Sequence, residues 1–309
     1  MPGLRARLFC FVLRHRHLLR LQLKRETIDW NTYEAVLRFR RDVESGAKFS
    51  ARLPDGIEIS PVTIGNITAE WVLPSRADKK KVMMYFHGGG YVSGTCRSHR
   101  MHVAKFVKNS QTGALLFEYR LAPEHPFPAA LDDAVEVYHW LLDQGISSSR
   151  IFFIGDSAGG GLCLATLLAL RDHGTHLPAA AAVFSPVTDY TCTGESHRTN
   201  AKRCLAPEGT GPAFARHYGG KNDLRLPYIS PLYGELQGLP PILIYVGGDE
   251  TLLDDSVRFA EKAEQAGVDV TLKIGEGLFH CYPVCAPLFP EATQAMEEIC
   301  AFIKTHIAS

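Results

Sequence analysis

The stretch Ile151-Phe152-Phe153-Ile154-Gly155-Asp156-Ser157-Ala158-Gly159 joins an apolar run to a serine flanked by glycines, and an Ala/Leu-rich segment follows it. The apolar run predicts a buried strand, and the segment after Ser157 predicts a helix. A chain that reverses sharply from strand to helix needs glycines two positions either side of the serine, because side chains there would collide with the backbone. The stretch therefore predicts that Ser157 is a nucleophile held at the edge of a sheet.

Apolar runs and helical patterns alternate on both sides of this turn. Strands are predicted at residues 57–62, 66–73, 82–86, 114–119, 151–154, 180–185, 242–246 and 268–274. Helices are predicted at 97–108, 158–171, 252–266 and 290–307, and a further helix follows residues 121–128 and ends at 142. From residue 82 onward this alternation is typical of α/β proteins, in which helices cover both faces of a parallel sheet. We therefore expect a single α/β domain over residues 1–309 with a mostly parallel central sheet.

Two regions, residues 1–50 and 189–228, do not follow the alternation, and we interpret both as a helical cap. In a helical projection of the first twenty residues, arginines flank or oppose one apolar face, which consists of Leu4, Leu8, Phe11, Val12, Leu18 and Leu19. Such an amphipathic helix would touch substrate or a membrane surface, or it would pack on its own protein. We favour packing on the protein over contact with a membrane.

Composition and charge exclude several classes of protein. A chain of 309 residues with 46% hydrophobic composition can bury a substantial core, so a disordered protein is excluded. Its formal net charge is zero, which gives no indication of a nucleic-acid partner. Seven of the 33 basic residues lie in the first 25 positions, where no acid occurs, so the N-terminus is a basic arm. The apolar stretch 8–13 is too short for a signal-peptide core or a membrane span. We predict a cytoplasmic protein without stable membrane insertion.

The cysteines and the glycine-rich turn indicate neither a metal nor a cofactor. Eight irregularly spaced cysteines without a CxxC motif predict free thiols, and a disulfide or metal site at Cys281 and Cys285 is the less favoured alternative. The triple glycine 88–90 lacks the GKS/T and GxGxxG patterns of nucleotide sites. We expect the protein to work without a cofactor.

Four turns that directly follow predicted strands carry the residue types of acyl-transfer chemistry. They begin after residues 86, 154, 246 and 274, and they contain His87, Ser157, Asp249 and His280 respectively. Because ligands bind outside the carboxyl ends of parallel strands, we expect these turns to converge at one edge of the sheet.

A serine nucleophile needs a base, and the base needs an acid that orients it. Ser157, Asp249 and His280 occur in the order Ser, acid, His, which is that of the α/β-hydrolases. His280 and His306 are the histidines that follow Asp249, and His306 falls at the end of the last predicted helix, where a solvated cation is the ordinary interpretation. Three further acids, Glu250, Asp254 and Asp255, follow Asp249. We place Asp254 and Asp255 inside the next helix and Glu250 in a supporting position.

The negative charge that builds up during acyl transfer requires preorganised hydrogen-bond donors. The amides of Gly88, Gly89 and Gly90 can approach a substrate closely, because glycines carry no side chain. The amide of Ala158, at the start of the helix after the nucleophile, is the second predicted source of an oxyanion hole. We expect His87 to anchor the glycine loop and not to take part in the proton transfers.

Three motifs make the chain resemble the hormone-sensitive-lipase family of α/β-hydrolases, its bacterial esterases in particular. They are HGGGY at residues 87–91, YRLAPEHPFPAA at 119–130 and GDSAGG at 155–160, and the similarity extends from about residue 82 to the C-terminus. The resemblance implies an α/β-hydrolase fold with a helical cap, and a carboxylesterase for short- to medium-chain esters that uses Ser157, Asp249 and His280. It also implies that Glu124 is a buried ion-pair partner and that a homodimer is a candidate assembly.

Two alternatives to a carboxylesterase stay open. The same catalytic residues can serve amide, lactone or carbamate hydrolysis. The second alternative is a non-catalytic binding protein on the same fold. The presence of His280 argues against this alternative, because receptors that resemble this family have lost that histidine. Residues 200–204 and 209–211 depart from the family's cap pattern, so the motifs do not predict which ester is preferred.

Overall fold

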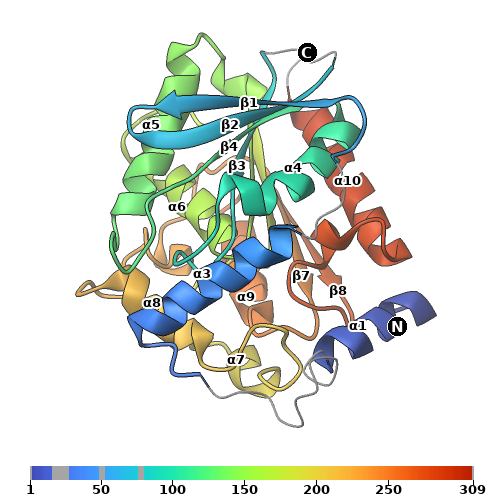
Figure 1. Cartoon of the computed structure of the whole chain (residues 1–309). Coiled ribbons are helices and arrows are strands. Elements are labelled where there is room, and N and C mark those ends of the chain that lie inside the picture. Colours follow the sequence, from blue (N-terminus) through green and yellow to red (C-terminus); the bar gives the residue numbers. More distant parts are fainter. Residues whose placement is uncertain (1, 16–27, 49–52, 76–79, 308–309) are drawn as a thin grey trace.

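The structure, a computed structural model, describes residues 2–15, 28–48, 53–75 and 80–307. Its centre is an eight-stranded sheet in the order β1-β2-β4-β3-β5-β6-β7-β8 (Figure 1). Strands β1 and β2 pair antiparallel, as do β2 and β4, and all other neighbours pair parallel. The strands are β1 (Ile57–Ile64), β2 (Ile67–Pro74), β3 (Val82–Phe86), β4 (Gly113–Phe117), β5 (Ile151–Asp156), β6 (Ala180–Phe184), β7 (Ile242–Gly247) and β8 (Val270–Gly275). The predicted α/β fold with a mostly parallel sheet is confirmed.

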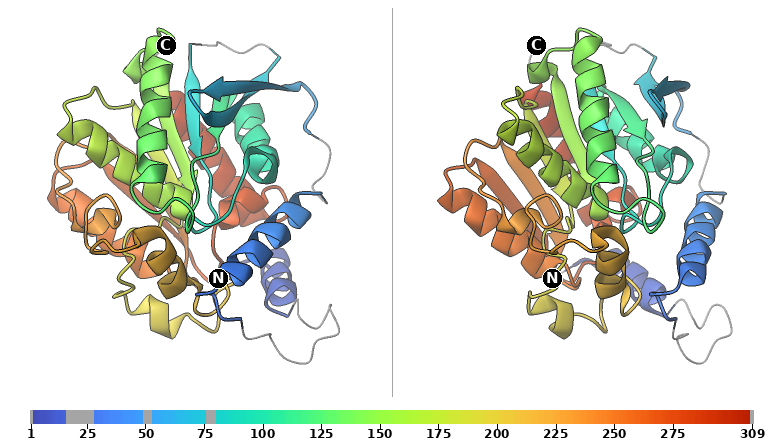
Figure 2. Two further views of the ribbon diagram at one scale, coloured as in Figure 1. Left: turned by 60° about the vertical axis from the view of Figure 1, so that its left-hand side comes forward. Right: turned by 90° about the vertical axis from the view of Figure 1, so that its left-hand side faces the viewer.

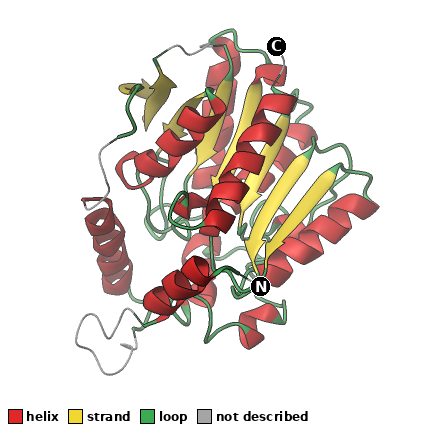
Figure 3. Cartoon of the chain, turned by 90° about the vertical axis from the view of Figure 1, so that its right-hand side faces the viewer, coloured by secondary structure: helices red, strands yellow, loops and turns green. Residues whose placement is uncertain are grey.

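Helices cover both faces of the sheet (Figure 3). One face is packed by α4 (Cys96–Ser110) and α10 (Pro290–His306), and the other by α5 (Ala129–Asp143), α6 (Ala158–Asp172) and α9 (Leu253–Gln265). Every residue of β3, β5 and β6 is therefore buried, which explains why these strands read as continuous apolar runs and not as alternating ones. Each fully buried aromatic or aliphatic side chain stabilises this core by roughly 1.5–3 kcal/mol.

Predicted and observed elements differ by a few residues at their ends. Strand β8 begins at Val270 and not at residue 268, because the amide of Val268 donates to the carbonyl of Ala263 and closes the end of α9. In the described ranges, short 3-10 helices lie between the larger elements: η1 (Ser148–Arg150), η2 (Pro231–Tyr233) and η3 (Tyr282–Cys285).

The remaining helices gather at one end of the molecule (Figures 1 and 2). They are α1 (Leu4–Arg14), α3 (Tyr33–Lys48), α7 (Ser196–Thr199) and α8 (Thr210–Gly219). The rings of Trp30, Phe39 and Phe214 pack together with centroids 5.3 to 6.1 Å apart, and Arg216 bonds to Asn31. These contacts join the N-terminal segment around α3 to the 189–228 region, the two parts that the sequence assigns to a cap.

Helix α1 packs on the protein through a different face from the one predicted. Ala6 and Cys10 are buried, and the ring of Phe9 contacts the rings of Phe279 and Phe289 at 5.8 and 5.6 Å. The predicted apolar face points away from the protein, with exposed fractions of 81% for Leu4, 63% for Leu8, 59% for Phe11 and 42% for Val12. Helix α1 therefore packs on its own protein, as predicted. The prediction that its apolar face makes this contact is wrong. The last two residues of that face, Leu18 and Leu19, lie outside the described residues.

Candidate active site

Ser157 occupies a strained turn between β5 and α6. Its φ and ψ of 54° and −122° are unusual for a residue with a side chain, and such a conformation costs roughly 1–3 kcal/mol. The backbone amide of Ser157 donates to the carbonyl of Phe184 at 2.8 Å, which holds the turn against the end of β6. A Cβ at Gly159 would collide with the carbonyl oxygen of Phe86, so only glycine permits this close approach of helix and strand. The turn therefore has the geometry of a nucleophile elbow.

His280 lies between Ser157 and a buried carboxylate. Its Nε2 is 3.0 Å from Ser157 Oγ, and its Nδ1 is 2.5 Å from Glu250 Oε2. The residue is in the turn that follows β8, whereas Glu250 follows β7 and Ser157 follows β5, so three strand ends at one edge of the sheet supply the three groups. When Nδ1–H donates to the carboxylate, Nε2 is left as the acceptor for the serine hydroxyl. This tautomer lets the imidazole accept a proton from Ser157.

The carboxylate that contacts His280 belongs to Glu250 and not to Asp249, which contradicts the predicted position of Asp249. Glu250 is fully buried, and its Oε1 accepts from Ser185 Oγ at 2.7 Å and from the amide of Gly247 at 2.6 Å. The carboxylate of Asp249 contacts Arg14 at 2.5 Å and lies 3.8 Å from Arg203. The turn after β7 directs these adjacent side chains into different surroundings, one inside the protein and one facing α1.

Charges near His280 favour its protonated form. Burial by itself lowers the pKa of His280, but the neighbouring Cys281 and Glu250 raise that pKa well above its ordinary value. Burial also raises the pKa of the Cys281 thiol, which therefore stays neutral near neutral pH. Glu250 is thus the group whose charge acts on the imidazole, and it stabilises the imidazolium that a proton transfer from Ser157 would create.

The glycine loop after β3 lies against the nucleophile turn. The amide of Gly88, predicted to be an oxyanion donor, instead donates to Asp156 Oδ1 at 3.1 Å. Within the described residues, the amides of Gly89, Gly90 and Ala158 have no hydrogen-bond partner. These three amides are therefore available to a ligand, whereas that of Gly88 is already used inside the protein.

Asp156 is a part of the site whose role is not predicted by the sequence motifs. Besides the amide of Gly88, its Oδ1 accepts from Tyr85 OH at 2.9 Å, and the side chain is buried beneath the loop. His87 holds the same loop through Nδ1, which bonds the carbonyl of Gly88 at 2.9 Å, and its ring stacks on Tyr119. Burial and the nearby His99 lower the pKa of His87 to about 3, so this imidazole stays neutral. The loop is therefore anchored by groups that do not face a substrate.

Helix α8 closes over the glycine loop. A Cβ at Gly90 would collide with the ring of Phe214, so this ring lies directly against the loop. Nearby, the rings of Tyr91 and Tyr218 stack at 3.7 Å. Phe214 thus brings the 189–228 region against Gly90 of the glycine loop.

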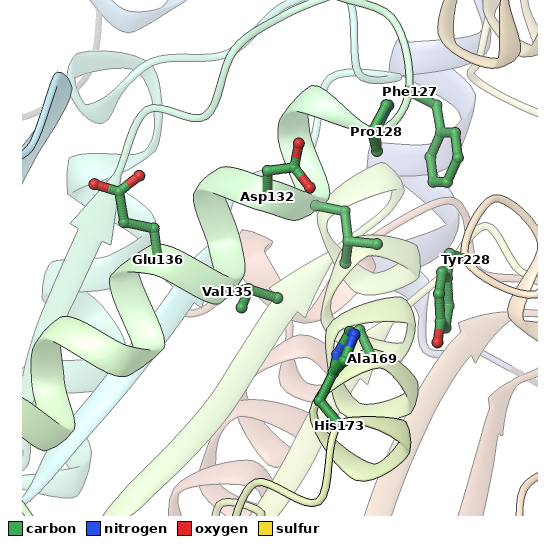
Figure 4. Close-up of a pocket in the computed structure, with 9 residues that line it drawn as sticks. Phe127, Pro128, Asp132, Val135, Glu136, Ala169, His173 and Tyr228 are labelled. Carbon is green, nitrogen blue, oxygen red and sulfur yellow. The ribbon is translucent and has the colours of Figure 1, made fainter.

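A separate groove lies away from these residues (Figure 4). It has a volume of about 500 Å³ between α5, α6 and the segment that carries Tyr228, and its lining includes Phe127, Leu131 and Val135. Ser157, Glu250 and His280 do not line this groove, so it adds nothing to their chemistry.

All eight cysteines lie in the part of the chain that the structure describes, and all are free thiols. In the same part, no three His, Cys, Asp or Glu side chains are grouped to hold a metal. None of its helices is both long and apolar enough to cross a membrane.

Known proteins share both sequence and fold with this chain. A family model for the alpha/beta hydrolase fold matches residues 83–284. The chain is 41% identical over 292 residues to an acetyl-hydrolase of Streptomyces hygroscopicus, which covers 92% of this chain and 96% of that protein. It is 37% identical over 249 residues to an esterase of Acinetobacter venetianus, which covers 80% and 82% respectively.

Solved structures give the same result. A crystal structure of an esterase from the bacterial hormone-sensitive lipase family is 38% identical, with a TM-score of 0.88 over 100% of both chains. The match therefore covers the whole length of both chains. The chain therefore belongs to the bacterial hormone-sensitive lipase family of α/β-hydrolases and is a carboxylic ester hydrolase.

Proposed function

We propose that the protein cleaves short- to medium-chain carboxylic esters through an acyl-enzyme on Ser157. His280 acts as general base and then as general acid, and Glu250 is its carboxylate partner. The observation that carries this proposal is the continuous chain of contacts from Ser157 Oγ through both ring nitrogens of His280 to Glu250.

In the first half of the reaction, Ser157 Oγ attacks the carbonyl carbon of the ester while His280 Nε2 takes the hydroxyl proton. The carbonyl oxygen becomes negatively charged, and the amides of Gly89, Gly90 and Ala158 donate hydrogen bonds to it. Each such donor contributes roughly 3–4 kcal/mol to the stability of the transition state. The bond between the acyl carbon and the alcohol oxygen then breaks, and His280 gives its proton to the departing alkoxide.

In the second half, a water molecule attacks the acyl-enzyme while His280 Nε2 takes one of its protons. The carboxylic acid leaves, and the proton returns to Ser157 Oγ. Glu250 keeps its negative charge throughout and stabilises the imidazolium in both halves, while its bonds to Ser185 and Gly247 hold it in place. The net reaction adds water across the ester bond.

The cap sets the size of the acyl group in this proposal. The cap comprises the segments within residues 1–50 and 189–228, and the ring of Phe214 against Gly90 supports a small acyl pocket. The names of two relatives, an acetyl-hydrolase and an ethyl acetate hydrolase of Pseudomonas putida that is 31% identical, agree with a short acyl chain.

We also propose that the protein is cytoplasmic and forms a homodimer. The free thiols of all eight cysteines support a reducing compartment, and we place the protein in the cytoplasm. Strand β8 ends the sheet, and its outer edge is unpaired among the described strands, which supports a homodimer formed through that edge. Sedimentation velocity measures the dimer directly, and a monomer at all concentrations would rule it out.

The function is tested by three variants that are assayed on a series of p-nitrophenyl esters of increasing acyl length. Ser157→Ala should lower kcat at least about a thousandfold, and Glu250→Gln about ten-thousandfold. Asp249→Asn, the matched control one residue away, should stay within about tenfold of the wild type because Asp249 does not contact His280. A full loss in Asp249→Asn with an active Glu250→Gln would return the acid role to Asp249.

Matched substrates separate the ester reaction from its alternatives. An ester and an anilide of the same acyl group should differ strongly in kcat/KM in favour of the ester. Equal rates would favour a broader amide hydrolase, and ligand binding without any release of product would favour a binding protein. Circular dichroism of each variant should match the wild type, which keeps misfolding apart from lost chemistry.

A further inference from the structure

Helix α1 lies at the periphery of the molecule (Figures 1 and 2). It has two apolar sides. The inner side, with Ala6, Phe9 and Cys10, is packed on the protein. The outer side carries large apolar side chains that are 42% to 81% exposed: Leu4, Leu8, Phe11 and Val12. Of the eight large hydrophobic side chains that are exposed in the described residues, four lie on this one helix face. So dense a group marks an interaction surface.

We propose that this outer face of α1 binds the surface of a membrane that contains anionic lipids. The inference goes beyond the proposed function and does not depend on ester hydrolysis. It concerns contact at the interface of the bilayer, with the helix lying in the plane of the headgroups, and not insertion across the membrane.

The charges around the outer face fit an anionic surface. Arg5 borders the apolar side chains along one edge, and Arg7 borders them along the other; both are exposed and have no ion-pair partner among the described residues. No acid occurs in the first 25 residues, which hold seven Lys and Arg residues. Leucine and phenylalanine between flanking arginines form the pattern of helices that lie in a lipid interface, where each guanidinium reaches the headgroups.

The size of the face favours lipid over a second protein. A stable protein interface uses about 20–30 residues on each side. Helix α1 has 11 residues, and only its outer half is exposed. A bilayer needs no complementary shape, so a few apolar side chains beside basic ones suffice for reversible binding. A groove of about 630 Å³ beside Leu8 and Phe11, also lined by Arg7, leaves room for an acyl chain or a headgroup.

The inner side holds α1 rigidly enough to act as a docking element. Cys10 Sγ donates to the carbonyl of Gly277 at 3.8 Å, and Phe9 contacts Phe279, so the helix rests on the turn that leads to His280. Arg14 binds Asp249, which is adjacent to Glu250. The proposed membrane face is therefore on the opposite side of α1 from the turns that carry the base and the acid.

The test measures binding of the full chain to lipid vesicles by co-sedimentation. Vesicles of pure phosphatidylcholine are compared with vesicles that also contain about one third phosphatidylglycerol, at low and at high salt. The wild type should bind the anionic vesicles at least about tenfold more strongly than the neutral ones, and salt should weaken that binding. The Ser157→Ala protein should bind equally well, which separates docking from catalysis.

A matched pair of double variants locates the contact. Arg7→Gln with Leu8→Ser removes one cation and one apolar side chain from α1, and binding should fall at least about tenfold. Arg225→Gln with Leu226→Ser makes the same changes at another exposed site, where Leu226 is 39% exposed, and should bind like the wild type. Both variants should keep the thermal midpoint of the wild type, because the altered side chains are exposed.

Four results would overturn the proposal. The first is a wild type that ignores anionic vesicles, and the second is an α1 variant that binds them as tightly as the wild type. The third is a change of sedimentation coefficient in the α1 variant, which would assign the face to a second copy of the chain. The fourth is a large drop in its thermal midpoint, which would mean that the chain itself covers the face.

Discussion

Asp249 and Glu250 are neighbours in the sequence but have opposite environments. Glu250 is fully enclosed and accepts bonds from a serine and a backbone amide as well as from His280. Asp249 instead connects the body of the protein to Arg14 of α1. Glu250, and not Asp249, contacts the imidazole, and its two further donors hold the carboxylate in place. This difference makes Glu250 the group that can stabilise an imidazolium.

The pH dependence of the reaction tests the link between Glu250 and His280. The base form of His280 is neutral, and its pKa is raised, so kcat/KM should fall as pH falls through that raised pKa. Glu250→Gln removes the negative charge, so the acid limb should move to lower pH while kcat decreases. The measurement is a kcat/KM profile between about pH 5 and 9. The profile of Asp249→Asn should have the same acid limb as that of the wild type. An acid limb that does not move in Glu250→Gln would contradict the effect of Glu250 on the pKa of His280.

At the scale of elements, one arginine attaches α3 to the body of the protein. Arg40 donates from Nε to the carbonyl of Val92 at 2.6 Å and from Nη2 to that of Ala122 at 2.9 Å. It also forms a two-pronged pair with Glu124, with both bonds at 2.7 Å. The expected ion pair of Glu124 thus exists, but the carboxylate is 34% exposed and not buried. Arg40 reaches from α3 to the chain segments that follow the glycine loop and β4.

Replacing this arginine should loosen α3 in a pH-dependent way. The hydrogen bonds from Arg40 lower the pKa of Glu124 to about 2. The ion pair therefore stabilises the folded protein fully above the unfolded pKa, about 4.3, and its contribution is lost as pH falls towards 2. Because both partners are partly exposed, Arg40→Gln should cost only about 1 kcal/mol at neutral pH. Urea unfolding at about pH 7 and pH 3 measures the difference, which should shrink at the lower pH.

The matched control for this effect is Arg198→Gln. Arg198 of α7 pairs at 3.0 Å with Glu195, which directly precedes that helix, but both side chains are more than 70% exposed. This substitution should leave the free energy of unfolding unchanged within about 0.5 kcal/mol. If Arg40→Gln destabilises the protein equally at both pH values, the ion pair with Glu124 is not the cause.

At the scale of the whole molecule, the N-terminal helices share the packing of the central domain. The inner side of α1 belongs to the same apolar cluster as α4 and α10, and Trp30 and Val36 belong to the cluster on the other face of the sheet. Segments that share a core unfold together. Differential scanning calorimetry should therefore record one cooperative transition for the full chain, with equal calorimetric and van't Hoff enthalpies. A separate early transition would show that the cap is an independent unit.

Most of the fold could be predicted from the sequence, because its signals are local. Buried parallel strands need continuous apolar runs, and the turn at Ser157 needs glycines at fixed spacings, so both are visible in a short window. The order of Ser157, His280 and an acid between them is equally a property of the chain. Where the elements end is less visible, as at Val268, because a single backbone hydrogen bond decides it.

Local sequence patterns were enough to predict the class of the sheet, the position of the nucleophile turn and the histidine beside it. Three features emerged only in the folded protein: which of two adjacent acids contacts His280, that Gly88 bonds Asp156, and which side of α1 faces the protein. All three have the same cause. A carboxylate, an amide or a helix face takes its role from partners that are distant in the chain, and only the folded protein brings those partners into contact.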